Sequence, residues 1–149
     1  MPHSLVILTG ASRGMGLALA EQLLHSGHTL VCMARHSNPQ LTALAATRGA
    51  TLEQWTQDLS HGAQAAERLR AWLLAQPARC YSRATLINNA GVLPRIAPLS
   101  HTDPADLAHA LRVGLEAPML LSAAFLGATE GWQSPQGQPL PRRVLNISS

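Results

Sequence analysis

The stretch from Leu5 to Gly16 constrains the fold of this chain more than any other part of the sequence. It reads Leu-Val-Ile-Leu-Thr-Gly-Ala-Ser-Arg-Gly-Met-Gly, and residues 17–24 continue it with a pattern typical of a helix. The four leading apolar residues have the length and composition of a buried parallel strand. Gly10, Gly14 and Gly16 let the backbone turn tightly, and the following helix start presents free N–H groups, so the segment predicts a pyrophosphate site. The same glycines are also compatible with a purely structural connection between strand and helix.

Composition narrows the class of protein. The 149 residues fit one domain, and a content of 46% hydrophobic and 13% charged residues is typical of a compact α/β protein. All 11 basic residues are arginine, and the net charge is +3. These arginines are scattered and few aromatic residues accompany them, which argues against a nucleic-acid interface, although a basic nucleic-acid binder stays a weaker alternative. The histidines are scattered as well, so we expect no metal site.

Cysteine usage and hydropathy indicate a compartment. Cys32 and Cys80 lie far apart in the sequence and form no Cys-x-x-Cys motif, so we expect buried or free thiols in a reducing cytoplasm. The sequence shows no apolar run long enough to cross a bilayer and no basic-then-apolar leader. We therefore expect a cytoplasmic protein without membrane contact.

Hydrophobic periodicity and turn residues place the other elements. Further strands are predicted at Thr29–Met33, Thr51–Thr56, Arg83–Ile87 and Val144–Ile147. The helices are expected to stop at Gly27, to span Asn38 to Gly49, to begin at a Ser60 cap, and to begin at a Thr102 cap with a kink at Pro118. Strands alternating with helices predict an α/β fold, a doubly wound (Rossmann-like) parallel sheet of five strands, truncated after the fifth. Ligands of such sheets bind at the carboxyl ends of the strands.

Four motifs, taken together, carry a family resemblance. They are Thr9 to Gly16, Asp58-Leu59 after the third strand, Asn88-Asn89-Ala90-Gly91 after the fourth, and Asn146-Ile147-Ser148-Ser149 at the fifth. In this order and at these separations they resemble the classical short-chain dehydrogenase/reductase family. Within that family the chain looks most like the bacterial benzil reductases and the sepiapterin reductases. Because the family's remaining motifs do not appear, residues 1–149 resemble its amino-terminal, dinucleotide-binding portion.

The resemblance implies a set of contacts with a nicotinamide dinucleotide. The expected cofactor-binding residues are Gly10, Ala11, Ser12, Arg13, Gly14, Met15 and Gly16 on the turn, Asp58 and Leu59 at the adenine, and Asn89, Ala90 and Gly91 near the nicotinamide-side ribose. Ser149 matches the catalytic serine, whose hydroxyl would bond the substrate carbonyl as negative charge develops there. Plainer interpretations stay open: a turn after a strand for the asparagines, a helix-proximal acid for Asp58, and a strand-end serine.

The end of the second strand bears on cofactor choice. Folds that prefer NAD place an acidic residue there to bind the ribose hydroxyls, whereas this chain reads Met33-Ala34-Arg35-His36. Arg35 together with Arg13 could hold a 2′-phosphate through charge-assisted hydrogen bonds. The sequence therefore predicts NADP(H), although a solvated arginine is the alternative.

Two departures from the family pattern limit what the chain can do. The family's Tyr-x-x-x-Lys motif would follow Ser149, whereas the single tyrosine, Tyr81, precedes the fourth strand and no lysine exists in the sequence. We expect Tyr81 at the amino edge of the sheet, opposite the cofactor. In addition, Gly114 stands where the family has an asparagine.

Two functional hypotheses follow. The resemblance implies an NADP(H)-dependent carbonyl reductase that transfers hydride between nicotinamide and a ketone or aldehyde, with the 149 residues inactive alone. The alternative is a non-catalytic dinucleotide-binding module or a degenerate reductase. The helix from Thr102 to Phe125 resembles the family's dimer-forming helix, which suggests a homodimer or homotetramer, although its leucines could equally pack in the core.

Overall fold

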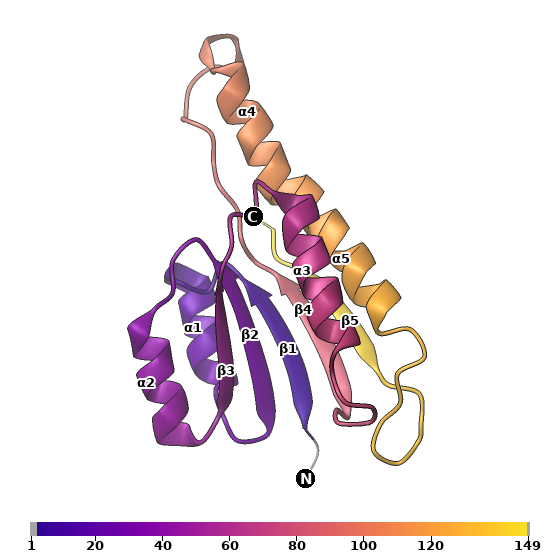
Figure 1. Cartoon of the computed structure of the whole chain (residues 1–149). Helices are drawn as coiled ribbons and strands as arrows, with labels where there is room; N and C mark the ends of the chain where they lie inside the picture. The colour runs from indigo at the N-terminus through magenta and orange to yellow at the C-terminus, as the bar shows by residue number, and fades with distance from the viewer. Residues whose placement is uncertain (1–2, 149) are drawn as a thin grey trace.

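A single parallel sheet forms the centre of the computed structural model, which describes residues 3–148. Its 5 strands lie in the order β3-β2-β1-β4-β5 (Figure 1). Their bounds are β1 (Ser4–Thr9), β2 (His28–Ala34), β3 (Thr51–Thr56), β4 (Arg83–Asn88) and β5 (Arg142–Asn146). The predicted doubly wound α/β fold is confirmed. The chain moves outward from β1 to β3 and then returns to β4, and this switch leaves a crevice at the carboxyl ends of the central strands.

Helices cover both faces of the sheet (Figure 1). One face carries α1 (Gly14–Leu23) and α2 (Pro39–Arg48), and the other carries α3 (Gly62–Leu74) and α5 (Ala117–Ala128). Before α5, a π-helical turn at Arg112–Glu116 joins it to α4 (Pro104–Leu111), which projects past the carboxyl edge of the sheet (Figure 1). A 3-10 turn at Leu99–His101 precedes α4.

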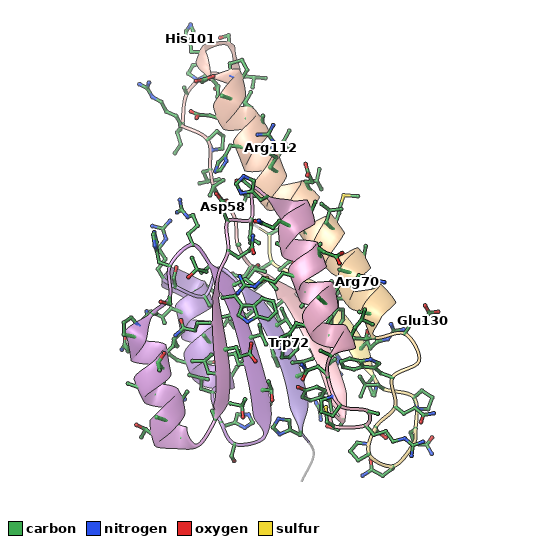
Figure 2. The ribbon with its side chains drawn as sticks, viewed as in Figure 1. Asp58, Arg70, Trp72, His101, Arg112 and Glu130 are labelled. Carbon is green, nitrogen blue, oxygen red and sulfur yellow. The ribbon has the colours of Figure 1, made fainter. Side chains whose placement is uncertain are left out.

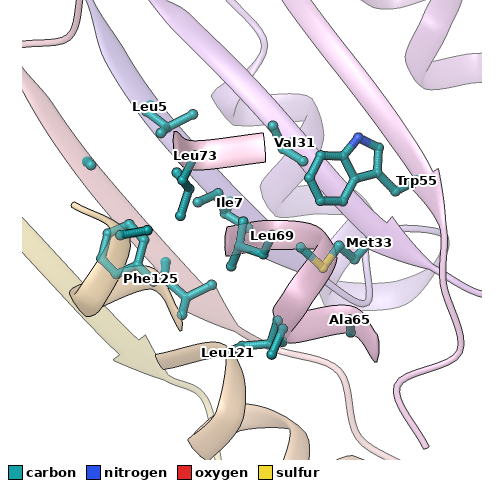
Figure 3. Packing of buried hydrophobic residues seen from close by; sticks show 14 of the residues in the cluster. Leu5, Ile7, Val31, Met33, Trp55, Ala65, Leu69, Leu73, Leu121 and Phe125 are labelled. Carbon is teal, nitrogen blue, oxygen red and sulfur yellow. The ribbon is translucent and has the colours of Figure 1, made fainter. Parts of the chain in front are cut away.

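The hydrophobic core has two parts, one on each face of the sheet. The larger part lies between the sheet and α3 and α5, where Ile7, Leu69 and Phe125 are fully buried (Figure 3). The smaller part includes Leu8 and Leu30 and lies against α1 and α2. Successive side chains of a strand point to opposite faces, so β1 supplies both parts of the core. This double burial explains its unbroken apolar sequence.

The edge strand β5 differs from β1 because it is largely exposed. It pairs only with β4 among the described strands, and its Leu145 is 50% exposed. Leu145 pairs with Ile87, whose side chain belongs to the core part that α1 and α2 cover. Helices α1 and α2 lie over the part of the sheet around β1, β2 and β3, so β5 leaves apolar surface exposed at the opposite edge strand.

Several helix ends differ from prediction. Helix α1 ends at Leu23, before the predicted stop at Gly27, because Leu24 leaves the helical conformation for an extended one (φ −79°, ψ 95°). Ser60 does not cap α3; its hydroxyl and N–H both donate to Asp58. Asp103, and not Thr102, caps α4, since its carboxylate accepts from the Ala105 N–H at 2.9 Å. An aspartate thus replaces the predicted hydroxyl as the cap of α4, whereas α3 begins after His61 without a side-chain cap.

The predicted kink at Pro118 takes the form of the π-helical turn that precedes α5. A proline lacks the N–H that would bond the carbonyl four residues earlier, here Gly114, and its ring crowds that carbonyl. A wider turn relieves the crowding, and the Ala117 N–H accordingly bonds the Arg112 carbonyl five residues back. Gly114 lies inside this turn with nothing within 4 Å of where a Cβ would stand, so nothing in the structure explains the glycine.

The apolar length of this helix corrects one expectation. Residues Pro104–Ala128 form 25 continuous helical residues with a window of mean hydropathy 1.3, enough by length and composition to cross a membrane. The sequence reasoning overlooked it because Pro118 divides the apolar run. Helix α5 supplies Leu121 and Phe125 to the core beside α3, although only 22% of that apolar window is buried.

Candidate functional site

A cavity of about 370 Å³ opens at the carboxyl ends of β1, β2 and β4. Its walls contain every residue predicted to contact a dinucleotide except Ala11, which is 1% exposed and packs into the smaller part of the core. The predicted residues that line it are Gly10, Ser12, Arg13, Gly14, Met15, Gly16, Arg35, Asp58, Leu59, Asn89, Ala90 and Gly91. The structure thus brings four separate segments of sequence to one surface.

The glycine turn between β1 and α1 has a steric basis. Gly10 adopts φ +72°, and a Cβ there would lie 2.8 Å from the Ala90 Cα. A Cβ on Gly16 would overlap the Gly10 carbonyl oxygen. Gly14 also has a positive φ, +58°, but nothing stands within 4 Å of its Cβ position. Gly10 and Gly16 are therefore needed for close packing, whereas Gly14 leaves open space at the start of α1.

Thr9 connects the glycine turn after β1 to the loop after β4. Its buried hydroxyl oxygen accepts from the backbone N–H of Asn89 and of Ala90, each at 3.0 Å. The Asn89 side chain in turn donates to the Gly10 carbonyl at 3.3 Å. These bonds fix the loop after β4 against the glycine turn after β1. Asn89 therefore connects two loops of the site and is not simply a residue of a turn after β4.

Asn88 ties the strands beneath the site. Its side-chain amide donates to Asn146 Oδ1 at 2.9 Å, across β4 and β5, and to the Ser122 hydroxyl on α5 at 3.3 Å. Its own Oδ1 is buried and has no hydrogen-bond partner among the residues that the structure describes. Asn88 and Asn89 thus connect β4 to its neighbours on both sides.

Asp58 stands where β3 gives way to α3 (Figure 2). Its Oδ1 accepts from the Ser60 hydroxyl at 2.7 Å and from the Ser60 N–H at 2.9 Å, while Oδ2 lies 3.8 Å from His61 Nδ1. The two Ser60 hydrogen bonds, followed by the charges of His61 and His109, hold the pKa of the Asp58 carboxyl below its ordinary value. At neutral pH the group is an ionised acceptor facing the cavity.

Arg13 and Arg35 are exposed and line the cavity from α1's start and from the end of β2. Neither forms an ion pair within residues 3–148. The backbone at this point is fixed, because the Gly10 N–H donates to the Met33 carbonyl at 2.8 Å. The two guanidinium groups are therefore available to an anion at this end of the cavity.

Several residues that line the cavity were not predicted from the sequence. They are Met33, Ala34, Gln57, Val92, His109 and Val113. Gln57 could have been found from its place beside Asp58, but its side chain serves the fold by donating to the Asp58 carbonyl and to Gln64. His109 and Val113 belong to the helix that begins at Pro104, far from Asp58 in the sequence. No local sequence pattern predicts that side chains of this helix line the cavity.

Tyr81 lies at the other end of the sheet, as predicted. It directly precedes β4, its ring stacks between those of His3 and Trp132, and its hydroxyl donates to Gln76 at 2.9 Å. Burial raises the pKa of the phenol to about 12. The group is therefore both distant from the cavity and poorly suited to give up a proton. Ser149, the predicted catalytic serine, lies outside the described residues.

Comparison with known proteins assigns a family. The short chain dehydrogenase model matches residues 4–149. The chain is 30% identical over 144 residues to a benzil reductase ((S)-benzoin forming) of Bacillus cereus, covering 97% of this chain and 55% of that protein. It is 34% identical over 153 residues to a sepiapterin reductase of Meriones unguiculatus, covering 96% and 56% respectively. The chain thus spans about half the length of the curated relatives it matches.

Solved structures agree with the sequence comparison. A short-chain dehydrogenase/reductase from Burkholderia vietnamiensis superposes with a TM-score of 0.78 at 37% identity, over 99% of this chain and 66% of that one. A metagenomic short-chain oxidoreductase in complex with NADP superposes with a TM-score of 0.75 at 30% identity, over 100% and 63%. In both, the shared part comprises the strands and helices described above.

Proposed function

The chain belongs to the short-chain dehydrogenase family, whose members are oxidoreductases that use a nicotinamide dinucleotide, and from this premise we propose that it is the cofactor-binding portion of an NADP(H)-dependent carbonyl reductase. The reaction is hydride transfer between nicotinamide and a ketone or aldehyde. The observation that carries the proposal is the cavity in which the glycine turn, Asp58 and the Asn89 loop meet. The dinucleotide supplies the hydride chemistry when bound, and the protein supplies binding and orientation.

The residues present fit such a group. Gly14, Met15 and Gly16 at the start of α1 line the cavity, and the first N–H groups of a helix have no partner within it and can bind a pyrophosphate. The Asp58 carboxylate would accept from the adenine amino group, with Leu59 beside it. Asn89, Ala90 and Gly91 would hold the ribose on the nicotinamide side. Ser149 would donate its hydroxyl to the substrate carbonyl.

The two cavity arginines support NADP(H) over NAD(H). Arg35 stands at the position where an acidic residue would favour ribose hydroxyls, and Arg13 lies across the turn. Neither guanidinium is occupied by a carboxylate in the part of the chain that the structure describes. A 2′-phosphate would receive charge-assisted hydrogen bonds from both. The metagenomic relative crystallised with NADP is consistent with this choice.

We propose that residues 1–149 are the dinucleotide-binding domain of a longer cytoplasmic enzyme. The general acid and its cationic neighbour would then belong to polypeptide that follows Ser149. A Tyr-x-x-x-Lys motif in the same reading frame would support the enzyme, whereas a stop codon would support a binding module. The apolar residues Leu111, Leu115 and Met119, each at least 55% exposed on the α4–α5 helix, suit a homodimer or homotetramer contact.

Cofactor titration tests the proposal. NADPH and NADH would be titrated against the wild type, Arg35→Ala and Arg70→Ala, the last being an exposed arginine on α3 away from the cavity (Figure 2). We expect the wild type to prefer NADPH and Arg35→Ala to raise the NADPH Kd about tenfold, the typical loss of a charge-assisted contact. Arg70→Ala should bind as the wild type does. Equal wild-type affinity for the two cofactors would overturn the NADP(H) assignment, and no binding of either would overturn the function.

A further inference from the structure

His109 is a cavity residue without a role in the proposed chemistry. It stands on α4, one helical turn before Val113, and both side chains line the cavity. Val113 is 6% exposed, while His109 is exposed at the cavity mouth. The outer part of the cavity therefore has an apolar wall at its base and an imidazole at its rim.

The π-helical turn accounts for this placement. Adding one residue to a turn rotates the helix that precedes it by about 100° relative to a continuous α-helix. Val113 lies within the turn, and α4 with His109 lies immediately before it. The change of helical phase between α5 and α4 thus decides which residue of α4 faces the cavity. The π-helical turn therefore helps to determine which side chains line the cavity.

Asp58 and Leu59 also line this cavity, from the segment between β3 and α3. Asp58 and His109 therefore reach one cavity from two different elements. One oxygen of Asp58 is taken by the two Ser60 bonds, and the other keeps capacity to accept. Leu59, 6% exposed, adds a second apolar surface. The opening therefore combines an acceptor, two aliphatic side chains and a flat ring.

We propose that His109 is a positioning residue for the adenine of the dinucleotide, covering the base that Asp58 holds by its amino group. The inference rests on the proposed function and adds to it a contact from α4. A purine has flat apolar faces and an amino donor at one edge, which match the aliphatic walls, the imidazole and the carboxylate. Stacking on a flat side chain contributes to binding whichever base edge is read.

The test compares ligands that contain the base. NADPH and 2′,5′-ADP, which carries the adenine without nicotinamide, would be titrated against His109→Ala, His109→Phe and the control His101→Ala. His101 lies at the far tip of the α4 arm, away from Asp58 (Figure 2). Removing the ring should raise the Kd of both ligands by the same factor, about fivefold, while a phenyl ring should restore the affinity. His101→Ala should change neither Kd.

The possible results separate the two proposals. His109 is exposed, so its variants should unfold at the wild-type urea concentration, and a changed affinity will not reflect a damaged fold. Wild-type affinity in His109→Ala, or failure of the phenyl ring to restore binding, would overturn the role of His109 while leaving the proposed function standing. If the wild-type chain binds neither nucleotide, the proposed function falls and this inference with it.

Discussion

The carboxyl and amino ends of the parallel strands differ in how they are packed: the first borders a cavity and the second is filled by aromatic rings. At the carboxyl end, Gly10 and Gly16 remove side chains where the backbone is crowded, and the space beyond them is a cavity with exposed arginines at its rim. At the amino end, the same strands meet a stack of rings, with Tyr81 buried between His3 and Trp132. One end is kept open for a ligand, and the other is filled. We expect substitutions at the first to affect binding and substitutions at the second to affect stability alone.

Gly16→Ala should have the largest effect and should break the open end. The added Cβ would overlap the Gly10 carbonyl oxygen, so the glycine turn must move. We expect dinucleotide binding to be lost and the free energy of unfolding to fall by about 1–3 kcal/mol, the usual range for overpacking. Urea denaturation and NADPH titration measure the two effects.

Gly127→Ala is the matched control for Gly16→Ala. Nothing lies within 4 Å of its Cβ position on α5, so the substitution should leave binding intact and raise the free energy of unfolding by up to about 1 kcal/mol through helix propensity. A Gly16→Ala variant that binds NADPH as tightly as Gly127→Ala would show that the turn is not the binding element.

Tyr81→Phe tests the filled end and has an intermediate effect. Gln76 loses the hydroxyl donor, which should reduce the free energy of unfolding by about 1 kcal/mol while dinucleotide affinity stays unchanged. We further expect the 149-residue chain to consume no NADPH with any carbonyl acceptor, with or without this substitution. Consumption that Tyr81→Phe abolishes would mean that the amino end contains the general acid.

Sequence reasoning succeeded where a residue's role depends on its immediate neighbours. The apolar run of β1 and the glycines after it determine a strand and a tight turn, and both were predicted. It failed where a role depends on segments brought together by folding. Whether Ala11 faces the cavity or the core depends on how α1 packs, and His109 lines the cavity from α4, on the far side of the π-helical turn that precedes Pro118.

The helix caps illustrate the same limit on a smaller scale. Ser60 and Thr102 each have a neighbouring aspartate that competes for the cap or for the hydroxyl itself. Propensity ranks these residue types almost equally, so the sequence did not decide between them. The backbone conformation at each helix start decides, and that conformation follows from the packing of the whole helix.

A change of pH should have the smallest effect and should appear at the filled end. Burial lowers the pKa of His28 from its ordinary value of 6.5, although its ring bonds the Leu23 carbonyl at 2.8 Å. The unfolded chain therefore binds a proton more readily than the folded chain. The contribution of His28 to stability is complete above the ordinary pKa and is lost as the pH falls through the window down to the lowered value.

Urea midpoints at about pH 7.5 and about pH 5, compared between wild type and His28→Gln, measure this contribution. The substitution should reduce the loss of stability on acidification, and the control His36→Gln, at an exposed position after β2, should not. An unchanged acid sensitivity in His28→Gln would assign the effect to other groups.

The bonds from Thr9 to the loop after β4 have a consequence for the order of events during synthesis. The Thr9 hydroxyl can form these bonds only after the ribosome has added Asn89 and Ala90, about 80 residues later in the chain. At translation speeds of 5–20 residues per second, that interval is roughly 4 to 16 s. During it β1 has β2 on one side and no partner on the other, so nascent chains shorter than about 90 residues should lack a nucleotide pocket however well their first strands are folded.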